Sequence, residues 1–307
     1  MSIILKLKVL LKRLVSKIFK SGSKFPAGHF HSPLIDKTVL NQDHLFELKS
    51  TFPGIDMNVD GQLDFLKKLG RHYRDIDFPD QRIINKKYYF DNPYFSYSDA
   101  IIYAAIIREV LPKNIVEVGS GYSTACALDT LDALAHQCSM TCIDPNPERL
   151  ESLLSAAEVS RVAIQAKNVQ QSSIEELVYG MLSGDILFID SSHISKAGSD
   201  LNYLLHEILP LVPRGVYVHF HDVFHGFEYP REWLEEGVEL NEQYILRSFL
   251  QFNEAFEVIL LSDYMEKHHR TWYEAYMPDC LRPHERHYAT QELIPHITGQ
   301  SLWIRRT

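Results

Sequence analysis

The sequence predicts an α/β fold with a doubly wound, mostly parallel sheet in three α/β/α layers. From residue 98 onward, short apolar runs rich in β-branched residues alternate with segments of helical periodicity. Several of these runs stop at a glycine or an aspartate, as strands of open α/β sheets do at their ligand-binding edge. The chain has 307 residues, 45% hydrophobic and 23% charged, which is enough for one sizeable domain with additions, or for two small domains.

The predicted elements follow in order along the chain. Residues 25–97 are irregular, with several prolines and scattered aromatic residues, and we expect an N-terminal cap whose clearest helix covers 62–69. Residues 98–307 form the predicted catalytic domain, and Ser98 or Asp99 caps its first helix. Predicted strands cover 114–118, 139–143, 162–166, 185–189, 215–220, 256–261 and 301–305, and the helices between them cover 123–135, 147–157, 173–182 and 196–209.

The net charge of −9 is unevenly distributed. The first 24 residues carry six lysines, one arginine and no acid, so they contribute +7 and the rest of the chain contributes −16. This acidic body argues against a nucleic-acid partner. No run reaches the roughly 18 apolar residues that a membrane-spanning helix needs. The four cysteines form no CxxC pair, which indicates reduced thiols in a cytoplasmic protein, with Cys126 and Cys142 packed in the core.

Residues 1–24 predict a basic amphipathic helix followed by a short flexible joint. Its apolar residues form one stripe at 100° per residue, and lysines flank that stripe. A helix of this kind can lie in an anionic membrane interface, which would hold the protein at the inner membrane surface through residues 1–20. The alternative is a helix that docks on the protein itself or on a second subunit of a homo-oligomer.

Polar residues follow the first two predicted strands at the point where each strand ends. Gly119-Ser120-Gly121 comes directly after the first strand, and Asp144 ends the second. The glycines permit a tight turn and close backbone approach, and the next helix presents free N–H groups. A carboxylate after the second strand can accept both hydroxyls of a ribose. Together they predict a site for a nucleoside-containing cofactor.

The Glu117-x-Gly119-x-Gly121 pattern resembles the first motif of class I S-adenosylmethionine-dependent methyltransferases, which have a Rossmann-like sheet with an antiparallel last strand. Segments 188–193, 199–203 and 215–222 resemble a bacterial branch with an Asp-x-x-His element, related to the sugar O-methyltransferases of macrolide biosynthesis. The likeness covers roughly residues 25–307. It implies O-methylation of a hydroxyl on a sugar, glycan or other small molecule. It also implies S-adenosylmethionine as the cofactor, bound by Glu117, Gly119, Ser120, Gly121, Asp144 and Asp190.

His193 is the predicted general base, because an imidazole with a pKa near 6.5 can take a proton from a hydroxyl at neutral pH. It follows Asp190 by three residues, so both side chains can face the cleft. The alternative is that His193 only caps the next helix or hydrogen-bonds the backbone.

Asp190, His221 and Asp222 form a second predicted catalytic group, because they end two adjacent strands and could hold a divalent cation such as Mg²⁺. The related sugar methyltransferases have a carboxylate where this chain has His221. That difference favours a softer metal, or none. His219 shares a strand face with His221, and its alternative role is that of a hydrogen-bonded core histidine.

Residues 265–300 are a predicted insertion rich in aromatic and cationic side chains, which would form a substrate lid or else a solvated excursion or subunit contact. Two other functions stay open. An NAD-dependent oxidoreductase could use a similar sheet, although Thr124 stands where its fingerprint needs glycine or alanine and no Tyr-Lys pair is evident. A non-catalytic, membrane-associated module with a nucleotide-binding fold is the other alternative.

Overall fold

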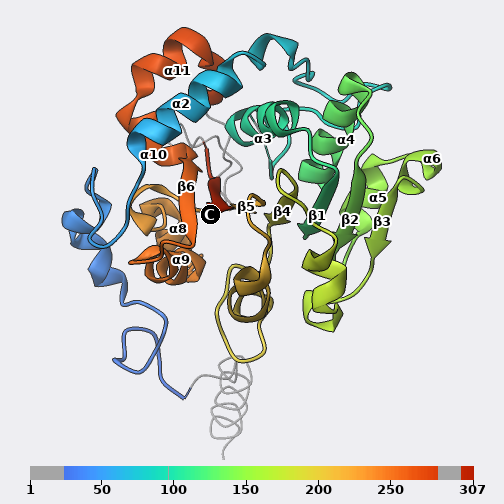
Figure 1. The fold of residues 1–307 in the computed structure, drawn as a ribbon. Helices are drawn as coiled ribbons and strands as arrows, with labels where there is room; N and C mark the ends of the chain where they lie inside the picture. The colour runs from blue at the N-terminus through green and yellow to red at the C-terminus, as the bar shows by residue number, and fades with distance from the viewer. Residues whose placement is uncertain (1–23, 96, 283–298) are drawn as a thin grey trace, which may run out of the picture.

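The computed structural model describes residues 24–95, 97–282 and 299–307, and these contain one seven-stranded sheet in the order β3-β2-β1-β4-β5-β7-β6 (Figure 1). β7 runs antiparallel to β5 and β6, and the other neighbouring pairs are parallel. The predicted fold, a mostly parallel sheet with an antiparallel last strand, is confirmed. The strands are β1 (Asn114–Val118), β2 (Ser139–Ile143), β3 (Val162–Gln165), β4 (Ile186–Ile189), β5 (Tyr217–Phe220), β6 (Phe256–Leu261) and β7 (Leu302–Arg306).

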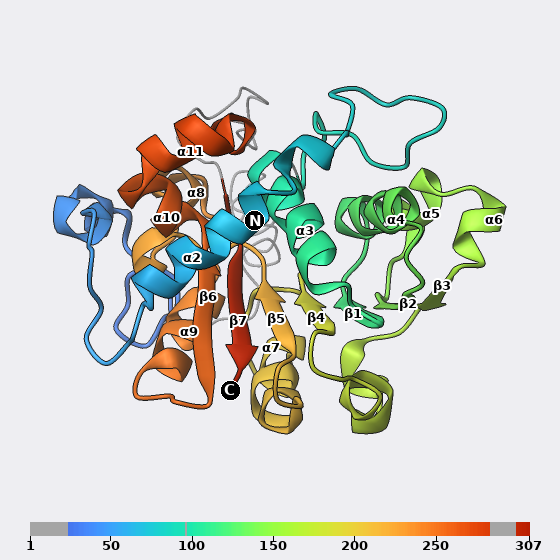
Figure 2. The same cartoon turned by 45° about the horizontal axis from the view of Figure 1, so that its top comes forward.

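Helices cover both faces of the sheet and give the predicted three layers (Figure 2). α2, α3 and α4 lie over one face, with α3 packed against both others, while α7 and α9 lie over the opposite face. The α-helices are α2 (Val59–Gly70), α3 (Tyr97–Val110), α4 (Tyr122–Leu134), α5 (Glu148–Leu153), α6 (Ala156–Val159), α7 (Asp200–Tyr203), α8 (Arg231–Glu236), α9 (Glu242–Leu250), α10 (Ser262–His268) and α11 (Arg270–Tyr276). Two π-helical segments cover Glu175–Tyr179 and Leu204–Ile208, and 3₁₀ turns cover Lys37–Asn41, Asp43–Phe46, Tyr73–Asp75, Val169–Gln171, Leu209–Leu211, His225–Phe227 and Pro278–Leu281.

The central strands are buried on both faces. Every residue of β4 and β5 is buried. Helices on both sides of a parallel sheet remove solvent from both faces, so such strands appear in a sequence as continuous apolar runs rather than as alternating patterns. Cys126 and Cys142 are fully buried, as predicted, and all four cysteines are free.

The helix predicted to begin at Ser98 or Asp99 begins one or two residues earlier. α3 starts at Tyr97, and both predicted caps lie inside its first turn, where they are buried. The Asp99 carboxylate accepts the N–H of Gln300 (2.9 Å) and the hydroxyl of Ser301 (2.6 Å). The prediction that Asp99 caps the helix is wrong, because this side chain instead fixes the segment that enters β7.

The predicted helices at 147–157 and 196–209 are shorter than expected because local caps interrupt them. The first is broken after Leu153, and α6 restarts behind Ser155, whose hydroxyl accepts the N–H of Glu158 (3.4 Å). The second starts at Asp200, behind Ser199, whose hydroxyl accepts the N–H of Asn202 (3.2 Å). Serine favours an N-cap over a helix interior, since its hydroxyl competes for backbone N–H groups.

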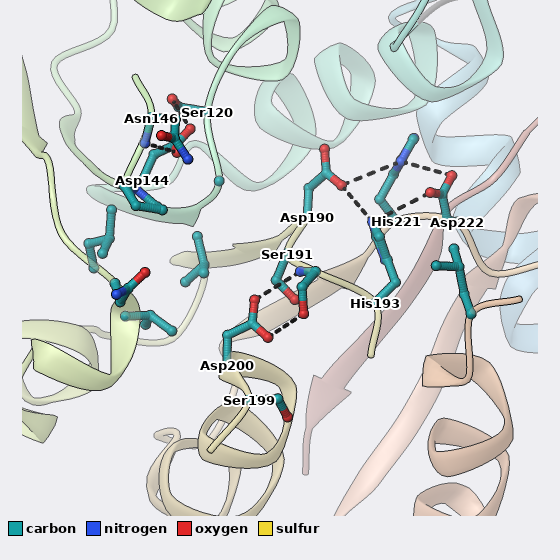
Figure 3. A pocket seen from close by; sticks show the side chains of 18 of the residues that line it. Ser120, Asp144, Asn146, Asp190, Ser191, His193, Ser199, Asp200, His221 and Asp222 are labelled. Atoms are coloured by element: carbon teal, nitrogen blue, oxygen red, sulfur yellow. Dashed lines mark hydrogen bonds and ion pairs between the residues drawn. The ribbon is translucent and has the colours of Figure 1, made fainter. Parts of the chain in front are cut away.

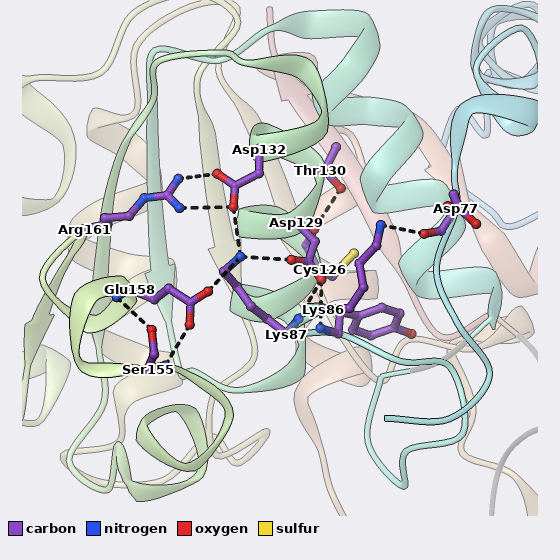
Figure 4. Close-up of polar contacts among 11 residues, drawn as sticks. Asp77, Lys86, Lys87, Cys126, Asp129, Thr130, Asp132, Ser155, Glu158 and Arg161 are labelled. Carbon is purple, nitrogen blue, oxygen red and sulfur yellow. Dashed lines mark hydrogen bonds and ion pairs between the residues drawn. The ribbon is translucent and has the colours of Figure 1, made fainter. Parts of the chain in front are cut away.

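A buried lysine fastens the N-terminal cap to the sheet domain (Figure 4). Lys87 Nζ lies 3.0 Å from Asp129 Oδ1, 2.8 Å from Asp132 Oδ2 and 3.1 Å from Glu158 Oε1. Asp129 also accepts two backbone N–H groups of the cap. Burial opposes the charge of Lys87, but the carboxylates outweigh it and raise the pKa of this lysine well above its usual value. The contacts fix the cap segment that continues to Tyr94.

None of the helices in residues 24–95, 97–282 and 299–307 combines the length and the apolar character needed to cross a bilayer. The basic amphipathic helix predicted for residues 1–20 lies outside the described part of the chain. So does the stretch 283–298 of the predicted insertion.

Candidate active site

A cavity of about 730 Å³ opens at the carboxyl ends of β1, β2, β4 and β5 (Figure 3). Parallel strands bring the residues that follow them to one edge of the sheet, which is where open α/β sheets bind ligands. Glu117 and Gly121 are the predicted site residues that do not line this cavity. The predicted residues that do line it are Gly119, Ser120, Asp144, Asp190, His193, His221 and Asp222.

The glycine turn forms one wall of the cavity. Gly119 has φ +94°, and a Cβ at this position would lie 2.1 Å from the backbone oxygen of Asp190, so no side chain fits there. Beside it, Ser120 Oγ donates to Asp144 Oδ2 (2.7 Å), and the N–H of Asn146 donates to Asp144 Oδ1 (2.8 Å). The Asp144 carboxylate is thereby held at the cavity wall, close to the turn.

Glu117 supports the glycine turn from beneath. Its side chain is fully buried and accepts the hydroxyl of Ser123 on one oxygen and that of Thr124 (2.7 Å) on the other. Thr124 Oγ1 in turn accepts the N–H of Gly121, the N-cap of α4 (3.1 Å). Burial raises the pKa of Glu117 to about 7, against the two hydroxyl hydrogen bonds that lower it. In this structure Glu117 acts on the shape of the turn.

Replacing Glu117 with glutamine should change how stability depends on pH. The folded-state pKa of about 7 lies above the ordinary 4.5. The stability contributed by this group is therefore complete below about pH 4.5 and is lost as the pH rises through 7. We expect up to about 3 kcal/mol of the free energy of unfolding to disappear between pH 5 and pH 8 in the unaltered protein. Chemical denaturation of E117Q between pH 5 and pH 8 should not show this loss of the free energy of unfolding.

The control for this measurement is Glu254→Gln, which neutralises an exposed carboxylate. E254Q should keep the pH slope of the unaltered protein. If the free energy of unfolding of E117Q depends on pH as steeply as that of the unaltered protein, the raised pKa of Glu117 is contradicted.

His193 lies between three carboxylates. Nδ1 is 2.6 Å from Glu242 Oε2, and Nε2 is 3.2 Å from Asp190 Oδ1 and 3.4 Å from Asp222 Oδ2. The helix that follows His193, α7, is capped by Ser199. The backbone carbonyl of His193 accepts the N–H groups of Asn241 and Glu242 at the start of α9, and its imidazole faces the cavity. Burial opposes the charge, but Glu242, Asp190 and Asp222 together raise the pKa of His193 well above that of an ordinary imidazole.

Asp190, His221 and Asp222 lie together as predicted, but their arrangement does not fit a metal ion. His221 Nδ1 is 3.3 Å from Asp222 Oδ1 and 3.8 Å from Asp190 Oδ1, and Nε2 is 3.7 Å from Asp99 Oδ2. Imidazole nitrogens thus pair with the carboxylates that would bind a cation. In the described residues no group of three or more His, Cys, Asp and Glu side chains could hold a metal ion. The divalent cation stays a prediction without a donor set in this part of the chain.

The surroundings shift the pKa values of two neighbouring histidines in opposite directions: His219 lies within β5, and His221 follows directly after it. Burial opposes the charge of His221, but Asp222 and Asp190 raise its pKa well above the usual value. Burial and the nearby His221 lower the pKa of His219 well below it. His219 stacks on Phe188 and bonds to Ser301 Oγ (2.9 Å), which is the predicted alternative of a hydrogen-bonded core histidine.

The structure adds cavity residues that the sequence analysis did not identify. On the glycine side, the Arg149 guanidinium stacks on the Tyr94 ring at 3.8 Å, and Tyr94 comes from the cap. On the Asp222 side, an apolar wall comes from α8 and the segment that follows it. That wall consists of Trp233, Val238 and Leu240. No strand-end pattern marks Tyr94 or this apolar wall, because they come from the cap, from α8 and from the segment after α8. Arg149 lies on α5, the helix that follows β2.

Residues 265–282 of the predicted insertion lie against the cap and do not line the cavity, whereas Gln300, at the end of the insertion, does line it. Tyr73 donates its hydroxyl to Asp279 (2.5 Å), and the Arg282 guanidinium lies 4.0 Å from the Tyr97 ring centre. These contacts tie the segment to α3 and to the cap residues before it. The lid that was predicted for 265–300 is not formed by this part of it.

Comparisons with known proteins give one family match and several structural likenesses. An uncharacterized protein of Archaeoglobus fulgidus is 36% identical over 114 residues, which are 35% of this chain and 52% of that protein. Among solved structures, the chain is similar to the SAH-bound methyltransferase PaMTH1 of Podospora anserina (14% identity, 93% of this chain and 99% of that one, TM-score 0.44). It is also similar to a putative caffeoyl-CoA O-methyltransferase of Staphylococcus aureus (16% identity, 74% and 93%, TM-score 0.38).

The matched segment spans about half the length of the curated relative. The family model that matches the chain describes a methyltransferase domain, and its match covers residues 116–223, from β1 to just past β5.

Proposed function

We propose that this protein transfers a methyl group from S-adenosylmethionine to a hydroxyl of a sugar, glycan or other small molecule. One observation carries the proposal. A single cavity holds a glycine turn, a carboxylate fixed at the end of the second strand and an imidazole fixed beyond the fourth, namely Gly119, Asp144 and His193. The turn and Asp144 suit a nucleoside, and His193 suits an acceptor that must lose a proton.

The family match supports S-adenosylmethionine over NAD, because the model that matches residues 116–223 describes a methyltransferase domain. The charges of the cavity balance one another. Among its described lining residues, the aspartates are Asp144, Asp190, Asp200 and Asp222, and the cationic side chains are Arg149, Lys196 and the imidazoles of His193 and His221, whose pKa values are raised.

Each residue has a distinct role in this proposal. Bound S-adenosylmethionine supplies a methyl group on a positively charged sulfur, which keeps the electrons of the broken bond as a neutral thioether. Asp144 accepts the ribose hydroxyls, and the Gly119 turn lets the backbone approach the cofactor. His193 Nε2 takes the proton of the acceptor hydroxyl. Its raised pKa makes the neutral imidazole a stronger base, although a smaller fraction is neutral at pH 7.

Calorimetric titration of the purified protein with S-adenosylmethionine, and separately with NAD, tests the proposal. We expect micromolar binding of S-adenosylmethionine alone. Asp144→Ala should weaken this binding about tenfold or more, since charge-assisted hydrogen bonds to the ribose are lost. Asp60→Ala, which removes an exposed carboxylate on α2, should leave it unchanged.

The other outcomes separate the alternative functions. Binding of NAD alone would overturn the proposal in favour of an oxidoreductase. Binding of neither, together with liposome binding that depends on residues 1–20, would favour a non-catalytic module. If S-adenosylmethionine binds, transfer of its labelled methyl group to a panel of hydroxyl compounds identifies the acceptor class.

A further inference from the structure

We propose that Glu242 is a positioning residue for His193: it holds Nδ1 of the imidazole so that Nε2 faces the acceptor. The proposal rests on the function proposed above, in which His193 takes the acceptor's proton. Glu242 is the first residue of α9, and it lies 49 residues beyond His193 in the sequence.

The contact between the two side chains is short and buried. Glu242 Oε2 lies 2.6 Å from Nδ1 of His193, and only 1% of the Glu242 side chain is exposed. The second carboxylate oxygen, Oε1, is buried without a hydrogen-bond partner in the described part of the chain. A buried carboxylate oxygen left without a partner destabilises a fold by about 1–3 kcal/mol or more. The carboxylate therefore serves His193, since among the described residues this is the side-chain hydrogen bond that the carboxylate makes.

The backbone around this pair is clamped as well. The N–H groups of Asn241 and Glu242 donate to the carbonyl of His193 (3.2 and 3.1 Å). The Asn241 side chain accepts the N–H of Ser195 (2.6 Å) and donates to the carbonyl of Ser195 (3.2 Å). His193 itself has φ +56°, a left-handed conformation that persists in a non-glycine residue only when its surroundings impose it. α9 and the turn after β4 are thus joined at the imidazole.

This geometry dictates which nitrogen can react. When Nδ1–H donates to a carboxylate, the remaining lone pair of the neutral imidazole is on Nε2, and the ring cannot rotate without breaking the hydrogen bond. Nε2 is the nitrogen that faces Asp190 and Asp222 in the cavity. The same carboxylate stabilises the imidazolium that forms when the acceptor's proton arrives.

The test is Glu242→Gln, which keeps the size of the side chain but can present an amide N–H to Nδ1 and so favour the wrong tautomer. We expect kcat to fall about 10²-fold or more, while KM for S-adenosylmethionine stays within about twofold. Glu242→Asp, which keeps the charge, should recover part of the lost kcat. Glu254→Gln, the matched exposed control, should change neither constant.

A second readout does not depend on activity. ¹⁵N NMR of histidine-labelled protein, recorded at a pH above the raised pKa of His193 so that the imidazole is neutral and with H193A used to assign the signal, should show His193 protonated on Nδ1 in the unaltered protein and a shifted tautomer population in E242Q. If E242Q does not fold, E242D provides the kinetic test: its carboxylate is one methylene shorter and reaches Nδ1 less well, so kcat should fall while KM for S-adenosylmethionine stays within about twofold.

The outcomes of the two proposals are distinguishable. Unchanged kcat and an unchanged His193 tautomer in a folded variant would overturn the role of Glu242. If the unaltered protein neither binds S-adenosylmethionine nor transfers methyl groups, the proposed function fails, and the NMR comparison still decides whether Glu242 sets the tautomer.

Discussion

Replacing His193 with alanine should lower kcat for methyl transfer about 10²- to 10⁴-fold, the range that a positioned general base contributes. The affinity for S-adenosylmethionine should stay within about twofold, because His193 lies beyond β4 while the glycine turn and Asp144 lie at the ends of β1 and β2. Steady-state kinetics with the acceptor, together with calorimetric titration of the cofactor, measures both quantities.

A general base is identified by a large fall in kcat together with an unchanged affinity for S-adenosylmethionine. His206→Ala, which removes an exposed histidine, should alter neither constant and serves as the matched control. If H193A keeps its turnover, the proton is taken by another group and the role of His193 is lost. If H193A loses turnover and cofactor affinity together, the change has disturbed the cavity as a whole.

Replacing Lys87 with methionine should lower the free energy of unfolding by about 3–5 kcal/mol, the usual effect of removing one partner of a buried ion pair. Lys87 and Asp129 are almost fully buried, at 8% and 3% exposed, so the Asp129 charge would be left without its cation. Asp132 and Glu158 are more exposed, at 40% and 27%, and water would replace part of their contact. Chemical denaturation measures the loss.

Lys67→Met is the matched control, because Lys67 pairs with Asp64 at the surface, where both side chains are more than half exposed. That pair should contribute at most about 1 kcal/mol. K87M should also weaken binding of S-adenosylmethionine, since Lys87 fixes the cap segment that brings Tyr94 to the cavity. A K87M protein as stable as K67M would contradict the structural role of the buried network.

Much of the fold could be predicted from local sequence patterns. The apolar run at 185–189 and the observed β4 (Ile186–Ile189) differ by one residue, and the other strands agree similarly closely. The predicted helix boundaries were wrong where a single side chain decides where a helix begins. This is the case at Ser155 and Ser199, whose hydroxyls cap new helices. Asp99 also could not be placed from sequence, because its partners Gln300 and Ser301 lie about 200 residues away.

The candidate site also contains some residues that local sequence patterns reveal and others that they do not. Asp144, Asp190 and His193 could be found by sequence, because each follows a strand, and parallel strands bring such positions to one edge. The motif could not say whether Glu117 faces the cofactor or supports the turn. In a sheet with both faces covered, each direction is buried, so alternation gives no signal.

The sequence by itself determined the sheet, the turn at Gly119 and the strand-end residues, because these depend on periodicity and on contacts along one short segment. Only the tertiary structure decided that Glu242 meets His193, that Tyr94 joins the cavity and that imidazole nitrogens pair with Asp190 and Asp222. The contact of Glu242 with His193 and the place of Tyr94 in the cavity join segments far apart in the chain. Packing of whole elements fixes their distances, and no local pattern in the sequence records that packing.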